Sequence, residues 1–143
     1  MNVHAHLFTN EIIGYNWGYI LKAPQDKNIL VVHDSNIWQP LEDIGADRTK
    51  TVEMNPESAR LAYNKALNRD QSIIGWYHSH PQFEVDPSNI DVMNHNAYQA
   101  QFNKDNKPFM ALIVGTYSQT IEPTGLFTSL LKWFHLTGEK GKK

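Results

Sequence analysis

Apolar residues in the first third of the chain alternate with polar ones or form short continuous runs, a pattern typical of β-strands. It predicts a short strand over 3–8, a long β segment over 11–21 and a further strand over 29–33. The polar stretch 24–28 contains a proline and is typical of a turn, so the last two segments are expected to form a hairpin. The polar residues 39–53 that follow predict a long surface loop.

Two later segments carry apolar residues at helical spacing. The first is predicted to begin with Asn55 as N-cap and Pro56 at the first helical position, and to end near 68–70. Its inward face is expected to hold Ala59, Ala62, Tyr63 and Ala66. The second helix is predicted from Ser88 to about Asn103. Its inward face is expected to hold Ile90, Met93, Ala97 and Phe102.

Three more segments are predicted to be strands. Residues 72–80 end at a proline, residues 109–114 form a continuous apolar run, and residues 127–136 close the pattern. Strands and helices that alternate in this way indicate one mixed α/β domain. We expect this domain over residues 1–137, followed by a flexible basic tail over 138–143.

Composition narrows the classes of function. The chain has 143 residues and a formal net charge of −2, so no broad positive field is available for nucleic acid. It has no cysteine, so any metal ion must be held by histidine or carboxylate side chains. No apolar run approaches the ~18 residues of a membrane span, and no signal-peptide pattern is present. We therefore expect an intracellular protein, nuclear or cytoplasmic, that does not bind membranes.

The residues with the clearest chemical meaning are His78, His80 and Asp91. Two positions apart on a predicted strand, the two imidazoles project from the same face. Asp91 lies in the first turn of the following helix, and the intervening loop can bring it back to that face. Two imidazoles and one carboxylate leave the fourth position of a tetrahedral zinc ion open for water, which is typical of catalytic zinc.

Each part of this pattern also has a simpler explanation. Ser88 and Asp91 have the spacing of a helix capping box, the histidines can be packed strand residues, and Pro81 and Pro87 can be ordinary loop residues. The combined spacing of histidines, serine and aspartate is much rarer than its parts, and it favours a metal site.

The segment Gly75–Pro81, continued by Pro87–Asp91, resembles the JAMM motif of MPN-plus zinc metalloproteases. It is most similar to the subgroup that contains a histone deubiquitinase and related MPN-domain proteins. The resemblance extends upstream to Glu53–Pro56 and downstream to 97–99 and 109–114. It implies an MPN (JAMM) fold, in which helices flank a mixed, curved β-sheet in a single domain.

The resemblance also implies an activity, that of a zinc-dependent deubiquitinase. Such an enzyme hydrolyses the isopeptide bond between the ubiquitin C-terminal glycine and a lysine. One catalytic Zn²⁺ would be bound by His78, His80 and Asp91. Glu11 would act as general base and acid toward a metal-activated water, and Ser88 would stabilise the oxyanion. The implied partners are ubiquitin or a ubiquitin-conjugated protein such as a histone, and an MPN-type partner subunit.

Two other functions stay open at this point. The chain can be a non-catalytic MPN scaffold that binds partner proteins, although such relatives typically lack metal ligands that are present here. It can also be a JAMM hydrolase that acts on another ubiquitin-like protein or on a small molecule.

Aromatic residues and a further histidine lie near the motif. Trp76 and Tyr77 are predicted to be core residues, because they lie inside an apolar strand. His95 follows Asp91 by one helical turn, and is interpreted either as a packed helix residue or as a residue that supports the metal site. Tyr15 and Trp17 stand where the resemblance implies smaller residues beside Glu11.

Overall fold

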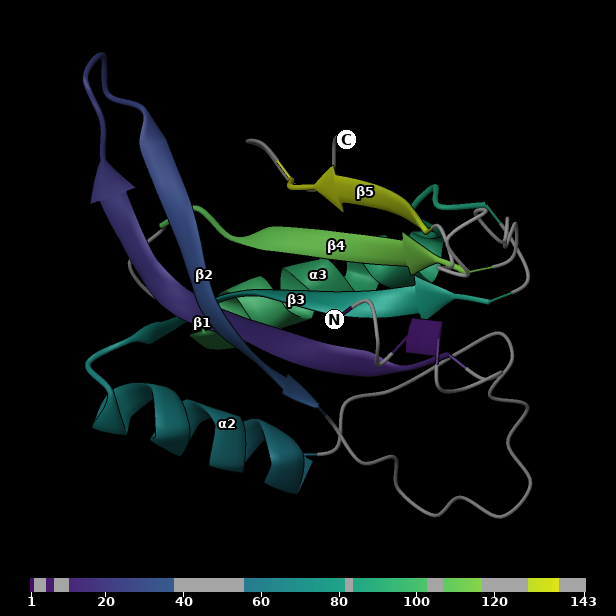
Figure 1. Ribbon diagram of the computed structural model, residues 1–143, viewed down its shortest axis with the longest axis horizontal. Helices are drawn as coiled ribbons and strands as arrows, with labels where there is room; N and C mark the ends of the chain where they lie inside the picture. The colour runs from purple at the N-terminus through teal and green to yellow at the C-terminus, as the bar shows by residue number, and fades with distance from the viewer. Residues whose placement is uncertain are drawn as a thin grey trace, which may run out of the picture.

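The computed structural model describes residues 1, 5–6, 11–37, 56–81, 84–102, 107–116 and 129–136. These residues form a five-stranded sheet with two long helices (Figure 1). The strands are β1 (Ile13–Lys22), β2 (Asn28–Ile37), β3 (Ser72–His80), β4 (Met110–Gly115) and β5 (Leu130–Phe134), and the helices are α2 (Pro56–Asn68) and α3 (Asn89–Phe102). Within these ranges no helix is long and apolar enough to cross a membrane. The predicted loop over 39–53 and the predicted tail over 138–143 lie outside the described residues.

The sheet has the order β2-β1-β3-β4-β5 and is mixed. β1 pairs antiparallel with both β2 and β3, and β5 pairs antiparallel with β4. β3 and β4 are parallel, and α3 lies in the connection between them, as a parallel pair requires. The predicted mixed α/β architecture with an MPN-type curved sheet and flanking helices is confirmed. The long twisted β1-β2 hairpin extends beyond the rest of the sheet (Figure 1).

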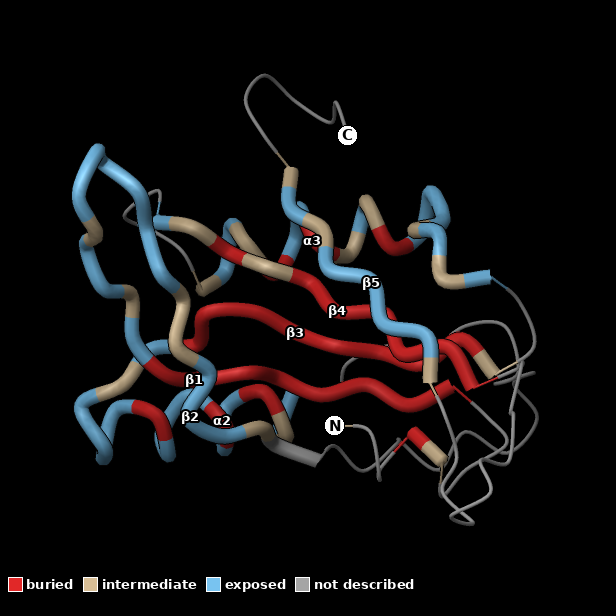
Figure 2. The backbone as a smooth tube through the Cα atoms, turned by 45° about the horizontal axis from the view of Figure 1, so that its top comes forward, coloured by how far each residue is buried: buried red, intermediate tan, exposed pale blue. Residues whose placement is uncertain are grey.

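Both helices pack on the same hydrophobic cluster. Ala62 of α2 and Tyr98 of α3 belong to it, together with Trp76 from β3 and Ala111 from β4. Because side chains alternate along a strand, Tyr77 faces the other side of the sheet, where it packs with Leu112 and Val114 of β4. The central strands β1, β3 and β4 are largely buried, whereas the hairpin tip and β5 are exposed (Figure 2). Trp76 and Tyr77 are core residues, as predicted.

The bulky residues on β1 fit this core. Tyr15 and Trp17 are both 2% exposed. The Tyr15 ring meets Tyr98 and Phe102 of α3 edge-on, at centroid distances of 5.9 and 4.8 Å. Such edge-to-face pairs are favourable arrangements of aromatic rings. The strand beside Glu11 is therefore well packed.

A bulge in β3 aligns the core with the candidate site. Asn16 pairs with Gly75 and Trp17 pairs with Ile73, so Ile74 is skipped in the ladder. For this reason Ile73 and Trp76, three positions apart, both reach the helix-facing cluster. Regular alternation after the bulge then places the side chain of His78 on the same face as Trp76.

Two local predictions are wrong. Ala5 and His6, the described part of the predicted strand over 3–8, are helical. In α3 the predicted inward residues Ile90, Met93 and Ala97 are exposed, and Met93 is 70% exposed. The buried residues of α3 are Asp91, His95 and Tyr98. The inner face of this helix is thus partly polar because it faces the candidate site, and its hydrophobic periodicity points to the wrong side.

Replacing Gly75 with alanine is expected to destabilise the fold by about 1–3 kcal/mol. A Cβ at this position would overlap the carbonyl oxygen of Met110 on the parallel strand β4, so the β4 backbone would have to move. Urea unfolding of the purified chain measures the change. Ser72→Ala, at the exposed start of the same strand, is the matched control and should stay within about 0.5 kcal/mol of wild type. Equal stability of Gly75→Ala and wild type would contradict the close approach of β3 and β4.

Candidate metal centre

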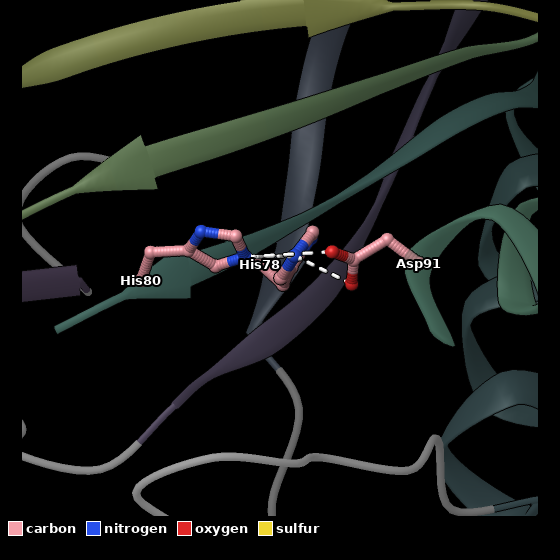
Figure 3. Close-up of side chains that lie close together, drawn as sticks. All are labelled: His78, His80 and Asp91. Carbon is pink, nitrogen blue, oxygen red and sulfur yellow. Dashed lines mark hydrogen bonds and ion pairs between the residues drawn. The ribbon is translucent and has the colours of Figure 1, made fainter. Parts of the chain in front are cut away.

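The end of β3 and the first turn of α3 bring His78, His80 and Asp91 together (Figure 3). The two histidines extend from β3, and the Asp91 carboxylate reaches toward them from α3 (Figure 3). All three residues are buried. The alternation along β3 and the helical position of Asp91 therefore produce the convergence that the spacing predicts.

Their facing atoms are close enough to share one ion. His78 Nε2 lies 2.9 Å from Asp91 Oδ1, and His80 Nε2 lies 3.5 Å from Asp91 Oδ2. The two Nε2 atoms are 3.0 Å apart. One ligand atom from each residue can be chosen so that all lie within 4.8 Å of one another. In the described part of the chain this is the one group of three or more such side chains.

The opposite nitrogen of His80 is held by the backbone. His80 Nδ1 lies 2.5 Å from the carbonyl oxygen of Glu84, and a carbonyl can only accept a hydrogen bond. The proton of a neutral His80 is thus on Nδ1, which leaves the Nε2 lone pair directed at the cluster. Metal-bound histidines are commonly oriented by such a bond.

Asp91 is held by a capping box at the start of α3. The Asp91 backbone N–H donates to Ser88 Oγ at 3.1 Å, and the Ser88 N–H donates to Asp91 Oδ2 at 2.7 Å. The sequence offered a capping box as an alternative to a metal site, but the structure contains both. The cap uses a lone pair of the Ser88 hydroxyl and leaves its proton for a donor role. Ser88 itself is exposed, beside the buried Asp91.

Burial and charge strongly perturb the titration of these groups. Burial lowers the pKa of His78 and outweighs the opposing effect of Asp91. Burial also lowers the pKa of His80, but the interactions with Asp91, the Glu84 carbonyl and Glu11 outweigh it and raise this pKa overall. Burial raises the pKa of Asp91, yet hydrogen bonds with both imidazoles hold it far below its ordinary range. The cluster therefore favours one ionised carboxylate facing two imidazole nitrogens.

Glu11 is the fourth charged residue of this region. It is buried, and desolvation raises the pKa of its carboxyl to about 8. The nearby His80 opposes this rise, whereas Asp91 adds to it. Both influences show that the Glu11 carboxylate lies beside the cluster. A raised carboxyl pKa beside convergent ligands is a common property of functional sites.

Ser79 fixes the position of the segment that carries Glu11. Its backbone N–H donates to the Ile12 carbonyl oxygen at 3.0 Å, and the Ile12 N–H donates to Ser79 Oγ at 3.0 Å. Ser79 is fully buried between the two candidate ligands in sequence, and its side chain points to the opposite face. The sequence did not single out Ser79. Only the register of β1 against β3 shows its role.

The residues present fit a zinc ion. Nitrogen and carboxylate oxygen are ligands that zinc commonly takes in proteins, and three protein ligands leave an open position. The crowding of His78 Nε2, His80 Nε2 and one carboxylate, all buried, is electrostatically favourable around a shared cation. The site can therefore hold a metal ion.

Comparison with known proteins agrees with this fold and site. The family model described as JAB1/Mov34/MPN/PAD-1 ubiquitin protease matches residues 2–104. The solution structure of a protein from Desulfitobacterium hafniense superposes with a TM-score of 0.59, covering 94% of this chain and 75% of that protein at 20% identity. That similarity concerns the fold alone. The chain belongs to the JAB1/Mov34/MPN/PAD-1 family.

Several relatives carry functional names. The histone deubiquitinase MYSM1 of Branchiostoma floridae is 30% identical over 131 residues, or 91% of this chain and 15% of that protein. The deubiquitinase MYSM1 of Mus musculus is 31% identical over 84% of this chain and 14% of its own length. The Lys-63-specific deubiquitinase BRCC36 of Camponotus floridanus is 40% identical over 44% of this chain and 22% of its own length. This chain therefore spans only a small part of these relatives.

The purified chain is expected to bind one equivalent of zinc, and Asp91→Ala is expected to lose it, because only two ligands remain. Metal analysis after dialysis and titration against a chromogenic chelator measure both. Glu84→Gln is the matched control, since Glu84 contacts His80 only through its backbone carbonyl in the bonds described here. Stoichiometric zinc in Asp91→Ala would rule out this ligand set.

Proposed function

We propose that this chain is the catalytic domain of a zinc-dependent deubiquitinase that hydrolyses the isopeptide bond between the ubiquitin C-terminal glycine and a lysine. The observation that carries the proposal is the buried cluster of His78, His80 and Asp91 with the Glu11 carboxylate beside it. The names of the relatives support ubiquitin as the substrate class.

In this proposal His78, His80 and Asp91 bind the zinc ion. When bound, the ion would lower the pKa of a water molecule to about 7 and would polarise the scissile carbonyl. The protein contributes the orientation of the ligands through the Glu84 carbonyl and the Ser88 cap. Rigid ligands of this kind hold one coordination position open for the reaction.

Glu11 is proposed as the residue that moves protons. Its burial raises the carboxyl pKa to about 8, and a divalent cation beside it would favour the ionised form and lower this value again. A carboxylate whose pKa lies near neutrality can accept a proton from water and later donate it to the leaving lysine amine. The hydrogen bonds between Ser79 and Ile12 keep Glu11 at a fixed place relative to β3.

Ser88 is proposed as the donor to the oxyanion that forms at the attacked carbonyl. Its hydroxyl accepts the Asp91 N–H in the cap, so its own proton can be donated outward. The residue lies at the exposed N-terminus of α3, where an arriving peptide group can reach it. The positive end of the helix dipole supports negative charge at the same place.

The finer parts of the proposal concern partners and place. A ubiquitin-conjugated protein such as a histone is the proposed substrate, because one relative is named for a histone and another for Lys-63-linked ubiquitin. An MPN-type partner subunit and a nuclear or cytoplasmic location belong to the same proposal, as does the absence of direct binding to nucleic acid or membranes. A non-catalytic scaffold, or a hydrolase acting on another ubiquitin-like or small-molecule substrate, remains the alternative.

Glu11→Gln is expected to reduce the cleavage rate about 10²–10⁴-fold, because the amide cannot accept a proton. Linkage-defined di-ubiquitins and a ubiquitinated nucleosome, each with one equivalent of zinc, are the substrates to assay by gel. The variant should still bind zinc, since Glu11 lies outside the ligand set. A variant that cleaves at the wild-type rate would contradict the role of Glu11. A wild-type chain that binds zinc but cleaves none of these substrates would favour another substrate or a required partner.

Ser88→Gly separates the two uses of the serine. Glycine is a tolerated N-cap, so the stability of α3 should change by only a few tenths of a kcal/mol. Loss of the hydroxyl donor is expected to lower kcat about 10²–10³-fold with little change in KM. Steady-state kinetics and thermal unfolding measured side by side test this. Unchanged kcat at unchanged stability would leave Ser88 with the capping role alone.

A further inference from the structure

The two candidate histidine ligands differ in how their outer nitrogens are held. His80 Nδ1 has the Glu84 carbonyl as its partner. His78 Nδ1 is buried, and no hydrogen-bond partner for it exists among the described residues. Metal-binding histidines are usually oriented by a bond at this second nitrogen. Another contact must therefore fix the plane of the His78 imidazole.

Trp76 supplies such a contact. It lies two residues before His78, on the same face of β3, and the two rings are stacked with centroids 4.7 Å apart and an angle of 11° between their planes. Both side chains are 1% exposed, so the stack lies within the packed interior. The indole thus forms a flat wall that limits rotation of the imidazole.

His95 in turn fixes the indole. The Trp76 Nε1–H donates to His95 Nδ1 at 3.2 Å, and this bond is buried. His95 is fully buried on α3, with Phe109 and Phe134 beside its ring at 5.4 and 5.2 Å. Because Nδ1 accepts the bond, a neutral His95 carries its proton on Nε2.

The charge state of His95 agrees with this acceptor role. Burial lowers the pKa of His95 to about 4, the nearby His135 lowers it further, and Gln99 opposes the change. The imidazole is therefore neutral near pH 7. Tyr98 and Phe134 meet the indole edge-on at 5.2 and 6.4 Å, so the bond to His95 selects one orientation within an aromatic enclosure.

We propose that Trp76 and His95 are positioning residues for the metal ligand His78. His95 holds the Trp76 indole by its hydrogen bond, and the indole holds the imidazole plane by stacking. This inference rests on the proposed zinc site and adds residues that do not touch the ion. It also accounts for a polar, buried histidine at the centre of the α3 face, where an apolar residue would pack at least as well.

His95→Leu is expected to weaken zinc binding about tenfold, the lower end of the range for groups that orient a ligand from outside. The substitution leaves the Trp76 N–H without its acceptor, so the indole can leave the stacked position. His95→Gln restores an acceptor on the same turn and is expected to bind zinc within about twofold of wild type. Trp76→Leu removes the stacking ring and should weaken binding at least as much as His95→Leu.

Zinc affinity is measured by competition with a chelator on the full chain, and the visible spectrum of the Co²⁺-substituted protein reports ligand geometry directly. The thermal stability of each metal-free variant is recorded in EDTA. Ile73→Val is the matched control, because it trims the same cluster at the far end of β3. This control should lose stability and keep both the zinc affinity and the cobalt spectrum of wild type.

The possible outcomes separate the two proposals. Weak zinc binding and an altered cobalt spectrum in His95→Leu, with recovery in His95→Gln, support the positioning role. Wild-type affinity and spectrum in His95→Leu, with lower thermal stability, would overturn this inference and leave the zinc site intact. A wild-type chain that binds no zinc would overturn the proposed function, and the positioning role with it.

Discussion

Two imidazoles and a carboxylate lie buried against one another at the end of β3, and this crowding constrains the rest of the molecule. Removing such groups from water is unfavourable unless each has an opposite charge or a hydrogen-bond partner. Here the Asp91 carboxylate faces both Nε2 atoms, the Glu84 carbonyl holds the far side of His80, and the Ser88 N–H holds the carboxylate. The entry of α3 and the loop before it are thereby fixed by electrostatic needs as much as by packing.

The two faces of β3 divide the work of the site. Trp76, His78 and His80 point toward the helices, where the ligands and their aromatic support lie. Tyr77 and Ser79 point to the other face, where Ser79 binds the backbone of Ile12. Alternation along one strand thus connects the ligand cluster to the segment that bears Glu11. A one-residue slip of β1 against β3 would separate the two.

Much of the fold and the ligand set follows from local patterns in the sequence. The strand period of β3 and the capping box of α3 are short-range signals, so His78, His80 and Asp91 could be predicted together from spacing alone. The inner face of α3 could not, because Asp91 and His95 are buried for reasons of chemistry while Met93 is exposed. Hydrophobic periodicity is uninformative where a helix packs a polar face inward.

Long-range features were harder to predict. The bulge at Ile74, which brings Ile73 and Trp76 to one face, depends on pairing between β1 and β3. The helical conformation of Ala5 and His6 escaped a reading based on alternation, since a few residues give too little pattern. The proximity of Glu11 to the cluster was expected from family resemblance rather than from any property of the residues between them.

The bond between Ser79 and Ile12 joins positions 67 residues apart, whereas the three ligands lie within one continuous segment of β3, loop and α3. Contacts between distant parts of a chain close large loops and are entropically harder to form than local ones. The ligand cluster can therefore assemble from neighbouring elements before β1 joins the sheet. In folding terms, the proton-accepting carboxylate arrives with the long-range pairing, so a partly folded chain can gather its ligands without yet being able to cleave its neighbours.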